Sequence, residues 1–97
     1  MKYYTHLKMI YKIEFTVTSI RQLQSLDSES RQRILDYVKD VLSNANNPRE
    51  LGRALKGSFV GLWRYRVGNY RIICKIYDKE LVVCVLKVGH RREIYAK

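Results

Sequence analysis

Apolar and polar residues alternate near the start of the chain, between residues 10 and 17. Alternation with a period of two places every second side chain on the same face of an extended strand. The pattern therefore predicts a β-strand with one apolar face. Its apolar positions are Tyr11, Ile13, Phe15 and Val17.

Residues 1–8 show no such period, and a methionine at position 9 directly precedes the predicted strand. We therefore expect 1–8 to be an extension outside the fold and 9–97 to form the folded domain. A chain of 97 residues is large enough for one modest hydrophobic core and too short for a second.

Two helices are predicted after the strand. The first is short, begins at a hydroxyl cap on Thr18 or Ser19, and carries Ile20 and Leu23. The second begins at Asp27 or Ser28 and ends before a proline-containing turn. Its apolar residues recur at helical spacing and form one stripe. They are Ile34, Leu35, Val38, Val41, Leu42 and Ala45.

The second half of the chain predicts strands. Residues 49–57 show only a weak helical spacing, and three β segments follow at about 60–67, 70–77 and 81–89. An order of strand, two helices and three strands indicates an α+β domain. We expect a mainly antiparallel four-stranded sheet, with the two helices from the N-terminal half packed on one face.

The turn between the second and third predicted strands defines which side chains share a face. Gly68-Asn69 suits a two-residue hairpin, which pairs Val67 with Tyr70 and Arg66 with Arg71. Because side chains alternate along a strand, this register places several cations together on the face away from the helices. They are Arg64, Arg66, Arg71 and Lys75.

The next turn fits a loop of two or three residues. A two-residue loop would bury Lys87 beneath the helices, which is costly for an unpaired charge. We therefore predict the three-residue loop 78–80, which pairs Tyr77 with Leu81 and makes Cys74 and Cys84 neighbours on the apolar face. The last strand would then turn Val82, Cys84, Leu86 and Val88 towards the helices.

The charge balance of the chain indicates a binding surface. Nineteen Lys and Arg against nine Asp and Glu leave a net charge of +10, and residues 49–97 carry +8 of it. Such an excess indicates a polyanionic partner: nucleic acid, an acidic protein or a membrane surface. The alternative is a solvated basic face with no specific ligand. We define the basic face as Arg64, Arg66, Arg71, Lys75, Lys87 and Arg91, with Tyr95 joining it if the last strand continues.

Several other classes of protein are disfavoured. No CxxC or HxxxH spacing indicates a metal site, and the two cysteines are typical of buried thiols. No apolar run approaches the ~20 residues of a membrane span, and the N-terminus lacks the apolar stretch of a signal peptide. We expect a cytoplasmic protein without metal or cofactor.

The basic face suits RNA chemistry that needs no metal. An RNA 2′-hydroxyl can attack the adjacent phosphate if a base takes its proton, cations stabilise the phosphate and an acid protonates the leaving oxygen. The two histidines, His6 and His90, do not form a ribonuclease pair. Tyr95 can serve as the base if neighbouring arginines stabilise its phenolate and lower its pKa. On local grounds alone, a tyrosine near a terminus is more often a packing residue.

Three segments together resemble the RelE/ParE superfamily of bacterial toxin-antitoxin toxins, and within it the RelE branch. They are "LKG" at 55–57, "WRYRVGNYRIICKI" at 63–76 and "VLKVGHRREIYAK" at 85–97. The resemblance implies an endonuclease that enters the ribosomal A site and cleaves mRNA there, held inactive by a cognate antitoxin. It implies catalytic roles for Arg64, Arg66, Arg71, Arg91 and Tyr95.

Four further residues are expected to contact RNA: Lys75, Lys87, His90 and Arg92. The proton donor stays open between Arg91, favoured by the resemblance, and Lys87, His90 or a ribosomal RNA group. Two other functions also stay open. One is a ParE-like poison of DNA gyrase, and the other is an RNA-binding module without activity.

Overall fold

The computed structural model describes residues 10–95, so the proposed extension 1–8 lies outside the described residues. Within 10–95, no helix is long and apolar enough to cross a membrane. The elements, in chain order, are β1 (Lys12–Phe15), α1 (Val17–Gln24), α2 (Ser28–Tyr37), a π-helical turn (Val38–Leu42), a 3-10 turn (Pro48–Leu51), β2 (Arg53–Ala54), a second 3-10 turn (Gly57–Phe59), β3 (Trp63–Val67), β4 (Tyr70–Tyr77) and β5 (Val82–His90).

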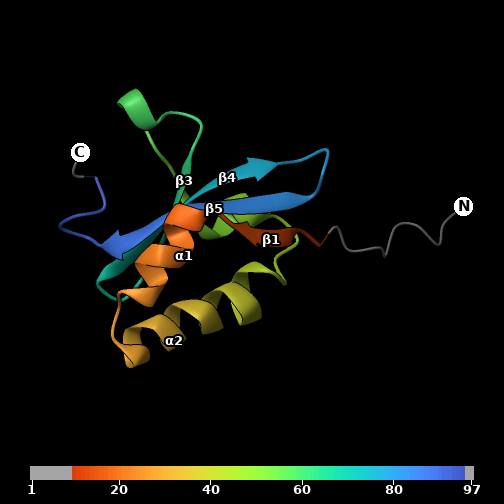
Figure 1. Cartoon of the computed structure of the whole chain (residues 1–97). Coiled ribbons are helices and arrows are strands. Elements are labelled where there is room, and N and C mark those ends of the chain that lie inside the picture. The colour runs from red at the N-terminus through yellow and green to blue at the C-terminus, as the bar shows by residue number, and fades with distance from the viewer. Residues whose placement is uncertain (1–9, 96–97) are drawn as a thin grey trace, which may run out of the picture.

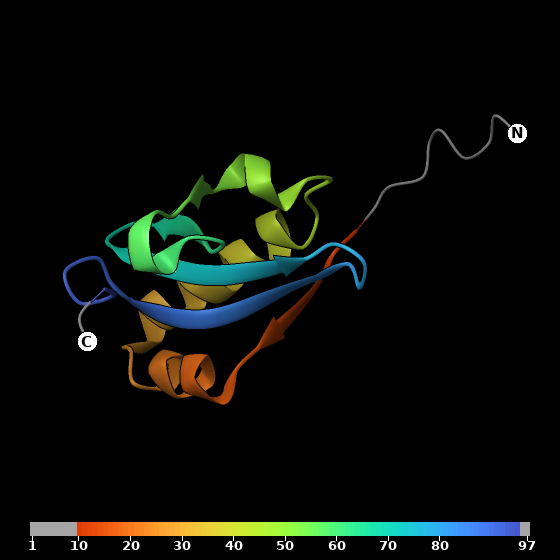
Figure 2. The same cartoon turned by 90° about the horizontal axis from the view of Figure 1, so that it is seen from above.

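The five strands form one sheet in the order β1-β5-β4-β3-β2. β1 runs parallel to β5 and the other neighbours are antiparallel. Both helices cover the same face of this sheet (Figures 1 and 2). The α+β fold class is thus confirmed, with five strands where four were predicted. The additional strand, β2, has only two residues, too few to produce a recognisable alternation.

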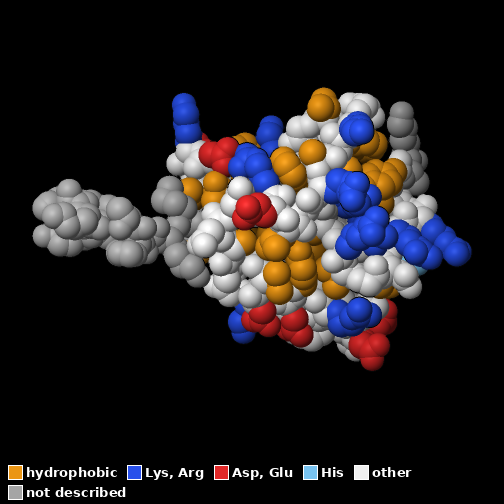
Figure 3. Space-filling view, turned by 180° about the vertical axis from the view of Figure 1, so that it is seen from behind, with side chains coloured by type: hydrophobic (Ala, Val, Ile, Leu, Met, Phe, Trp, Pro, Cys, Tyr) orange, Lys and Arg blue, Asp and Glu red, His pale blue; other side chains and the backbone are white. Residues whose placement is uncertain are grey.

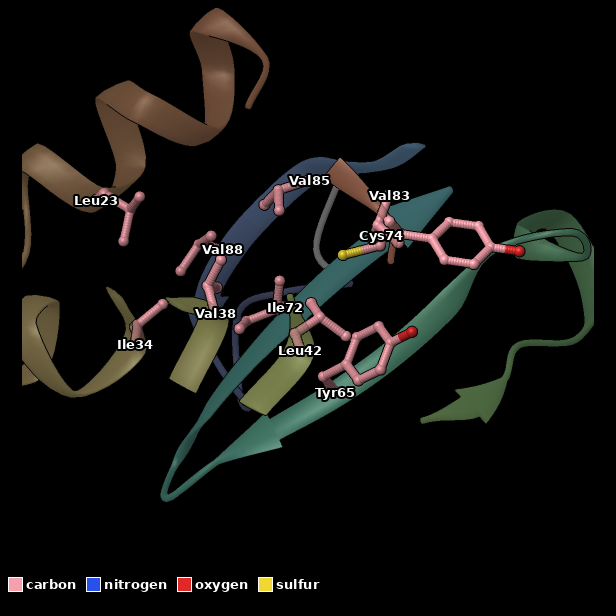
Figure 4. Close-up of a cluster of buried hydrophobic side chains, with 11 residues drawn as sticks. Leu23, Ile34, Val38, Leu42, Tyr65, Ile72, Cys74, Val83, Val85 and Val88 are labelled. Carbon is pink, nitrogen blue, oxygen red and sulfur yellow. The ribbon is translucent and has the colours of Figure 1, made fainter. Parts of the chain in front are cut away.

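The core lies between the helices and the sheet. Ile34, Val38 and Leu42 extend the predicted stripe of α2 into the π-helical turn, and all three are buried, whereas Val41 is 41% exposed. Figure 4 shows them facing apolar side chains of the three central strands. These strand residues are Tyr65, Ile72, Cys74, Val83, Val85 and Val88.

The first helix begins earlier than predicted. Its N-cap is Thr16, whose hydroxyl oxygen accepts a hydrogen bond from the backbone N–H of Ser19 at 3.1 Å. The same hydroxyl donates to the carbonyl oxygen of Leu86 at 3.1 Å, so one side chain ends β1 and ties α1 to β5. The predicted caps Thr18 and Ser19 are therefore wrong. In α2 the predicted cap Asp27 is confirmed, with its carboxylate accepting from the Ser30 N–H at 3.0 Å.

The hairpin prediction is confirmed. Val67 pairs with Tyr70 and Arg66 pairs with Arg71 across the Gly68-Asn69 turn. Gly68 has a φ of +58°, which glycine adopts at no steric cost. This register places the arginines of β3 and β4 on the face opposite the helices.

The predicted loop between β4 and β5 is wrong by one residue. Tyr77 pairs with Val82, so the loop has four residues and ends at Leu81, which has a positive φ of 54°. A slip of one residue moves every following side chain to the opposite face. A β-bulge then shifts the register again, because Cys74 pairs with Val85 whereas Ile73 pairs with Lys87.

The bulge divides β5 into two parts with opposite parity. Val83 and Val85 face the core, contrary to the predicted set Val82, Cys84 and Leu86. Beyond the bulge the predicted parity is restored. Val88 is buried in the core, and Lys87 pairs with Ile73 on the face of the sheet opposite the helices, which we call the free face.

The two cysteines are therefore not neighbours, contrary to our prediction. Cys74 is fully buried in the core, while Cys84 pairs with Lys75 and is partly exposed. Burial raises the pKa of both thiols, most strongly that of Cys74.

We expect Cys74→Ser to cost about 1–3 kcal/mol of unfolding free energy, because the hydroxyl is buried where no polar partner was needed. Cys84→Ser should change stability by no more than about 0.5 kcal/mol, as exposed substitutions generally do. Urea denaturation of both variants measures this difference. Equal losses would show that the two thiols share one environment.

Candidate functional site

The sheet register arranges the cations of the free face in two rows across the strands. In the first row Arg53 pairs with Arg64, Arg64 with Ile73, and Ile73 with Lys87. In the second row Arg66 pairs with Arg71, and Arg71 with Gly89. Seen from behind, the blue side chains of Lys and Arg gather at one end of the molecule, beside an apolar area (Figure 3).

Arg71 has the most fixed position of these cations. Its Nη1 donates to the carbonyl oxygens of Gly68 at 3.0 Å and Tyr70 at 2.9 Å, so the hairpin turn holds one edge of the guanidinium. Partial burial lowers the pKa of Arg71, and Arg66, Arg64 and Arg91 lower it further. Since arginine stays protonated in proteins, these groups form a concentrated positive field.

That field has an energetic cost. Two like charges 4 Å apart repel by about 1 kcal/mol in water and about 4 kcal/mol near a protein surface. Within residues 10–95 the single salt bridge is Arg49–Asp78, so no described carboxylate neutralises the basic face. An anion that binds between the arginines relieves this repulsion.

The segment after β5 folds back towards the basic face. The backbone N–H of Arg91 donates to the Asn69 carbonyl oxygen at 2.8 Å, which anchors the segment to the β3–β4 turn. Ile94 is buried, and a Cβ at Gly89 would lie 3.3 Å from its Cδ1. Gly89 therefore leaves room for the chain to turn. β5 ends at His90, so Tyr95 does not join the basic face as part of a continued strand.

Tyr95 reaches the site by this turn. Its ring packs edge-on against Phe59, with the two ring centroids 5.4 Å apart. It is 37% exposed, and it lies close enough to Arg71 for a phenolate at this position to raise the pKa of that arginine. The packing interpretation and the catalytic one are both compatible with this position, because Phe59 holds the ring while part of it faces solvent.

The four residues expected to contact RNA lie at different places. Lys87 lies on the free face, but Lys75 lies four residues from Arg71 along β4, about 13 Å at strand spacing. Its ammonium is 5.2 Å from the centroid of the Tyr77 ring. His90 packs edge-on against Tyr70, and its Nδ1 accepts from the backbone N–H of Arg92 at 3.1 Å. The Arg92 side chain is exposed.

Sequence reasoning missed two residues of this region. Arg53 was placed in a weakly helical segment, but it lies in β2 directly opposite Arg64. Phe59, the packing partner of Tyr95, lies in a short turn between strands. A two-residue strand and a single turn of 3-10 helix leave no periodic signal, so only the spatial pairing identifies them.

A polar cluster at the opposite end of the sheet supports the chain near β2. Both terminal nitrogens of Arg49 donate to the carboxylate of Asp78 at 2.8 Å, and the Tyr11 hydroxyl donates to it at 2.7 Å. The Tyr65 hydroxyl donates to the Pro48 carbonyl oxygen at 2.7 Å. These bonds tie the Pro48–Leu51 turn to β3 and to the β4–β5 loop.

The hydrogen bonds from Arg49, and then that from Tyr11, hold the pKa of Asp78 below its usual range. A carboxyl whose pKa is lowered in the folded state stabilises the fold above its unfolded pKa of about 3.9, and this contribution is lost as the pH falls through the folded value. Asp78→Asn should thus lower the melting temperature at neutral pH, and the gap from wild type should close in acid. Asp40→Asn is the control, because no described partner bonds its carboxylate. A difference in melting temperature between Asp78→Asn and wild type that does not change with pH would contradict this dependence of stability on the ionisation of Asp78.

No group of three His, Cys, Asp or Glu side chains that could hold a metal ion occurs in the described part of the chain. The ligand chemistry of the basic face is that of arginine. Its planar fork of donors matches the oxygens of phosphate and carboxylate.

Comparisons with known proteins give the family. A sequence model described as the ParE toxin of the type II toxin-antitoxin system parDE matches residues 13–95. The toxin RelG of Mycobacterium tuberculosis is 30% identical over 89 residues, which are 92% of this chain and 100% of RelG. The toxin RelE of the same organism is 31% identical over 85 residues, covering 88% of this chain and 86% of that protein.

Solved structures agree with these sequence relatives. The RelBE2 toxin-antitoxin complex of M. tuberculosis contains a chain that matches with a TM-score of 0.77 and 29% identity, covering 84% of this chain and 99% of that one. The archaeal RelE–RelB complex of Pyrococcus horikoshii matches with a TM-score of 0.66 and 28% identity, covering 87% and 98%. This chain therefore belongs to the RelE/ParE superfamily and is the toxin of a RelBE-type toxin-antitoxin system.

Proposed function

We propose that this toxin is an endoribonuclease that cleaves mRNA in the ribosomal A site, by attack of an RNA 2′-hydroxyl and without metal. The observation that carries the proposal is the convergence of Arg66, Arg71, Arg91 and Tyr95 at one end of the free face. Arg66 and Arg71 are direct cross-strand partners, and Arg91 is anchored to the turn that joins their strands. Tyr95 packs on Phe59 and, like Arg91, lies near enough to Arg71 to influence its pKa.

The chemistry assigns a role to each group. The scissile phosphate lies between the guanidinium groups of Arg66 and Arg71, with Arg64 beside them. The Tyr95 phenolate, stabilised by these arginines, takes the 2′-proton as the 2′-oxygen bonds to phosphorus. The bond to the 5′-oxygen breaks, which leaves a 2′,3′-cyclic phosphate. The arginines stabilise the extra negative charge of the transition state.

The leaving 5′-oxygen needs a proton. Arg91 is the proposed donor, although arginine gives up a proton reluctantly. Lys87 is the alternative on the same face. His90 is less well placed, because its Nδ1 already accepts a hydrogen bond from Arg92 and its ring packs on Tyr70.

The proposed regulator is a cognate antitoxin. The solved relatives from M. tuberculosis and P. horikoshii are complexes of a toxin with its antitoxin. We propose that an antitoxin segment with apolar and acidic side chains contacts residues 49–60 and masks the basic face, because its charge complements the +8 of residues 49–97. An antitoxin complex that still cleaves mRNA would exclude inhibition by masking.

The deciding experiment is primer extension on an mRNA in a translating extract, with and without the toxin. Cuts within codons at the A site that disappear when ribosomes are removed would support the proposal. The family model is described by ParE, and this favours gyrase poisoning as the second candidate. Inhibition of DNA supercoiling by purified gyrase, with intact mRNA in the extract, would establish that candidate instead.

A further inference from the structure

An open pocket of about 230 Å³ lies at the side of the sheet formed by β2 and β3. Five residues line it, and three of them are arginines from two strands. They are Leu51, Gly52, Arg53, Arg64 and Arg66. The pocket shares Arg66 with the second row, in which Arg66 pairs with Arg71, and it lies on the side of Arg66 away from Arg71.

Among residues 10–95, no acidic side chain neutralises this pocket. Arg53 and Arg64 are directly opposite each other across the β2–β3 pair, an arrangement that is destabilising for like charges. None of the five lining residues is acidic, and the one salt bridge among residues 10–95 involves other side chains. An anion bound here would remove a repulsion that the fold otherwise bears.

Arg64 gives a second, independent indication. Its Nε is buried and has no hydrogen-bond partner among the described residues. A buried donor without an acceptor is unfavourable. Arg64 also lines the pocket, so an oxyanion bound there supplies acceptors to a side chain that lacks one. The burial of the Arg64 guanidinium therefore costs less free energy with an anion bound than without one.

Gly52 keeps Arg53 close to β3. A Cβ at position 52 would lie 2.8 Å from Cε1 of Tyr65 and 3.0 Å from the carbonyl oxygen of Arg64. Only glycine lets the chain approach β3 this closely. Arg53 therefore stands one strand spacing, about 4.8 Å, from the strand that carries Arg64 and Arg66.

We propose that this pocket binds the RNA phosphate next to the scissile one, with Arg53 as its main contact. The inference rests on the proposed function and adds to it a second phosphate site that sets the register of RNA on the sheet. RNA is favoured over an acidic peptide because the pocket shares Arg66 with the second row, where the scissile phosphate is proposed to bind. A polynucleotide that fills the first position always presents another phosphate one nucleotide away.

The test uses a short single-stranded RNA with a 2′-deoxy sugar at the cleaved position, so that it binds without reacting. Each phosphate in turn is replaced by a neutral methylphosphonate, and affinity is measured by fluorescence anisotropy. For the wild type, neutralising the phosphate beside the scissile one should weaken binding roughly tenfold, as expected for one charge-assisted contact. For Arg53→Gln the same replacement should have no further effect.

Salt dependence provides a second readout. Arg53→Gln should reduce the slope of log affinity against log salt by about 0.7, the value for one phosphate contact on a single strand. Arg53→Lys should retain the slope while losing part of the affinity, because lysine keeps the charge without the planar fork. Arg21→Gln, an exposed arginine in α1 on the helix side, makes the same charge change and should leave both quantities unaltered.

Two results would overturn the inference. One is an identical response of wild type and Arg53→Gln to every methylphosphonate. The other is unchanged RNA binding by Arg53→Gln with a selective loss of affinity for an acidic glutamate-rich peptide, which would make the pocket a carboxylate site. Because the probe cannot be cleaved, these outcomes are independent of activity. A positive methylphosphonate map with no cleavage of mRNA would retain the pocket and reject the proposed nuclease.

Discussion

Tyr95→Phe should slow the cleavage step by roughly 10²- to 10⁴-fold, the range for loss of a positioned general base. The substitution keeps the aromatic ring, and so the edge-on contact with Phe59 persists. Fold, antitoxin binding and ribosome binding should therefore be retained. Single-turnover cleavage on programmed ribosomes with saturating toxin measures the chemical step apart from binding.

Two matched variants separate catalysis from packing. Tyr77→Phe removes a phenol with nearly the same exposure, 39% against 37%, near the opposite end of the sheet, and should cleave at the wild-type rate. Phe59→Leu weakens the support of the Tyr95 ring but keeps its hydroxyl, so we expect a smaller loss. If Tyr95→Phe cleaves as fast as wild type while Phe59→Leu does not, the tyrosine is a packing residue. Lys87 or His90 would then be the better candidates for proton transfer.

Arg71→Ala should lower the cleavage rate at saturation by roughly 10²-fold, comparable to the removal of one preorganised donor to a developing oxyanion. The effect is large because the carbonyl oxygens of Gly68 and Tyr70 already fix one edge of the guanidinium. RNA affinity should also fall, by roughly tenfold for one lost charge-assisted contact. Arg71→Lys should recover some affinity and little of the rate, because it restores the charge but not the fork.

Arg71→Ala should leave the fold intact or make it slightly more stable. Arg71 lies among Arg64, Arg66 and Arg91, whose charges lower its pKa, so its removal relieves repulsion. We expect a change of no more than about 0.5 kcal/mol in unfolding free energy. Arg33→Ala is the control, since Arg33 in α2 approaches the Gly68 turn from elsewhere on the fold and is outside the basic face. Equal loss of cleavage in both variants would mean that the hairpin turn, not the guanidinium of Arg71, supports activity.

Much of the architecture could be predicted from local patterns. The Gly68-Asn69 turn specifies its own register, and that register places Arg64, Arg66 and Arg71 on one face whatever the rest of the chain does. The α2 stripe and the Asp27 cap are likewise local, because helical spacing and a capping carboxylate act within a few residues.

The β4–β5 connection could not be predicted in the same way. Its sequence allows several loop lengths, and each extra residue inverts the parity of the next strand. The choice depends on which side chains fill the core beneath α1 and α2, and here Val83 and Val85 do so in place of Cys84. The bulge at Leu86 then returns Val88 to the core and Lys87 to the free face. The predicted facing of side chains is therefore wrong only in the first half of β5.

The basic face and its chemistry were thus determined by the sequence itself, through turn type and the two-residue period of strands. Tertiary structure alone decided what surrounds that face. Arg53 joins it because Gly52 permits close approach to Tyr65, and Tyr95 reaches it because Gly89 leaves room for Ile94 and Phe59 supports the ring. These contacts join residues distant in sequence and without a period of their own, so they exist only once the core has positioned both partners.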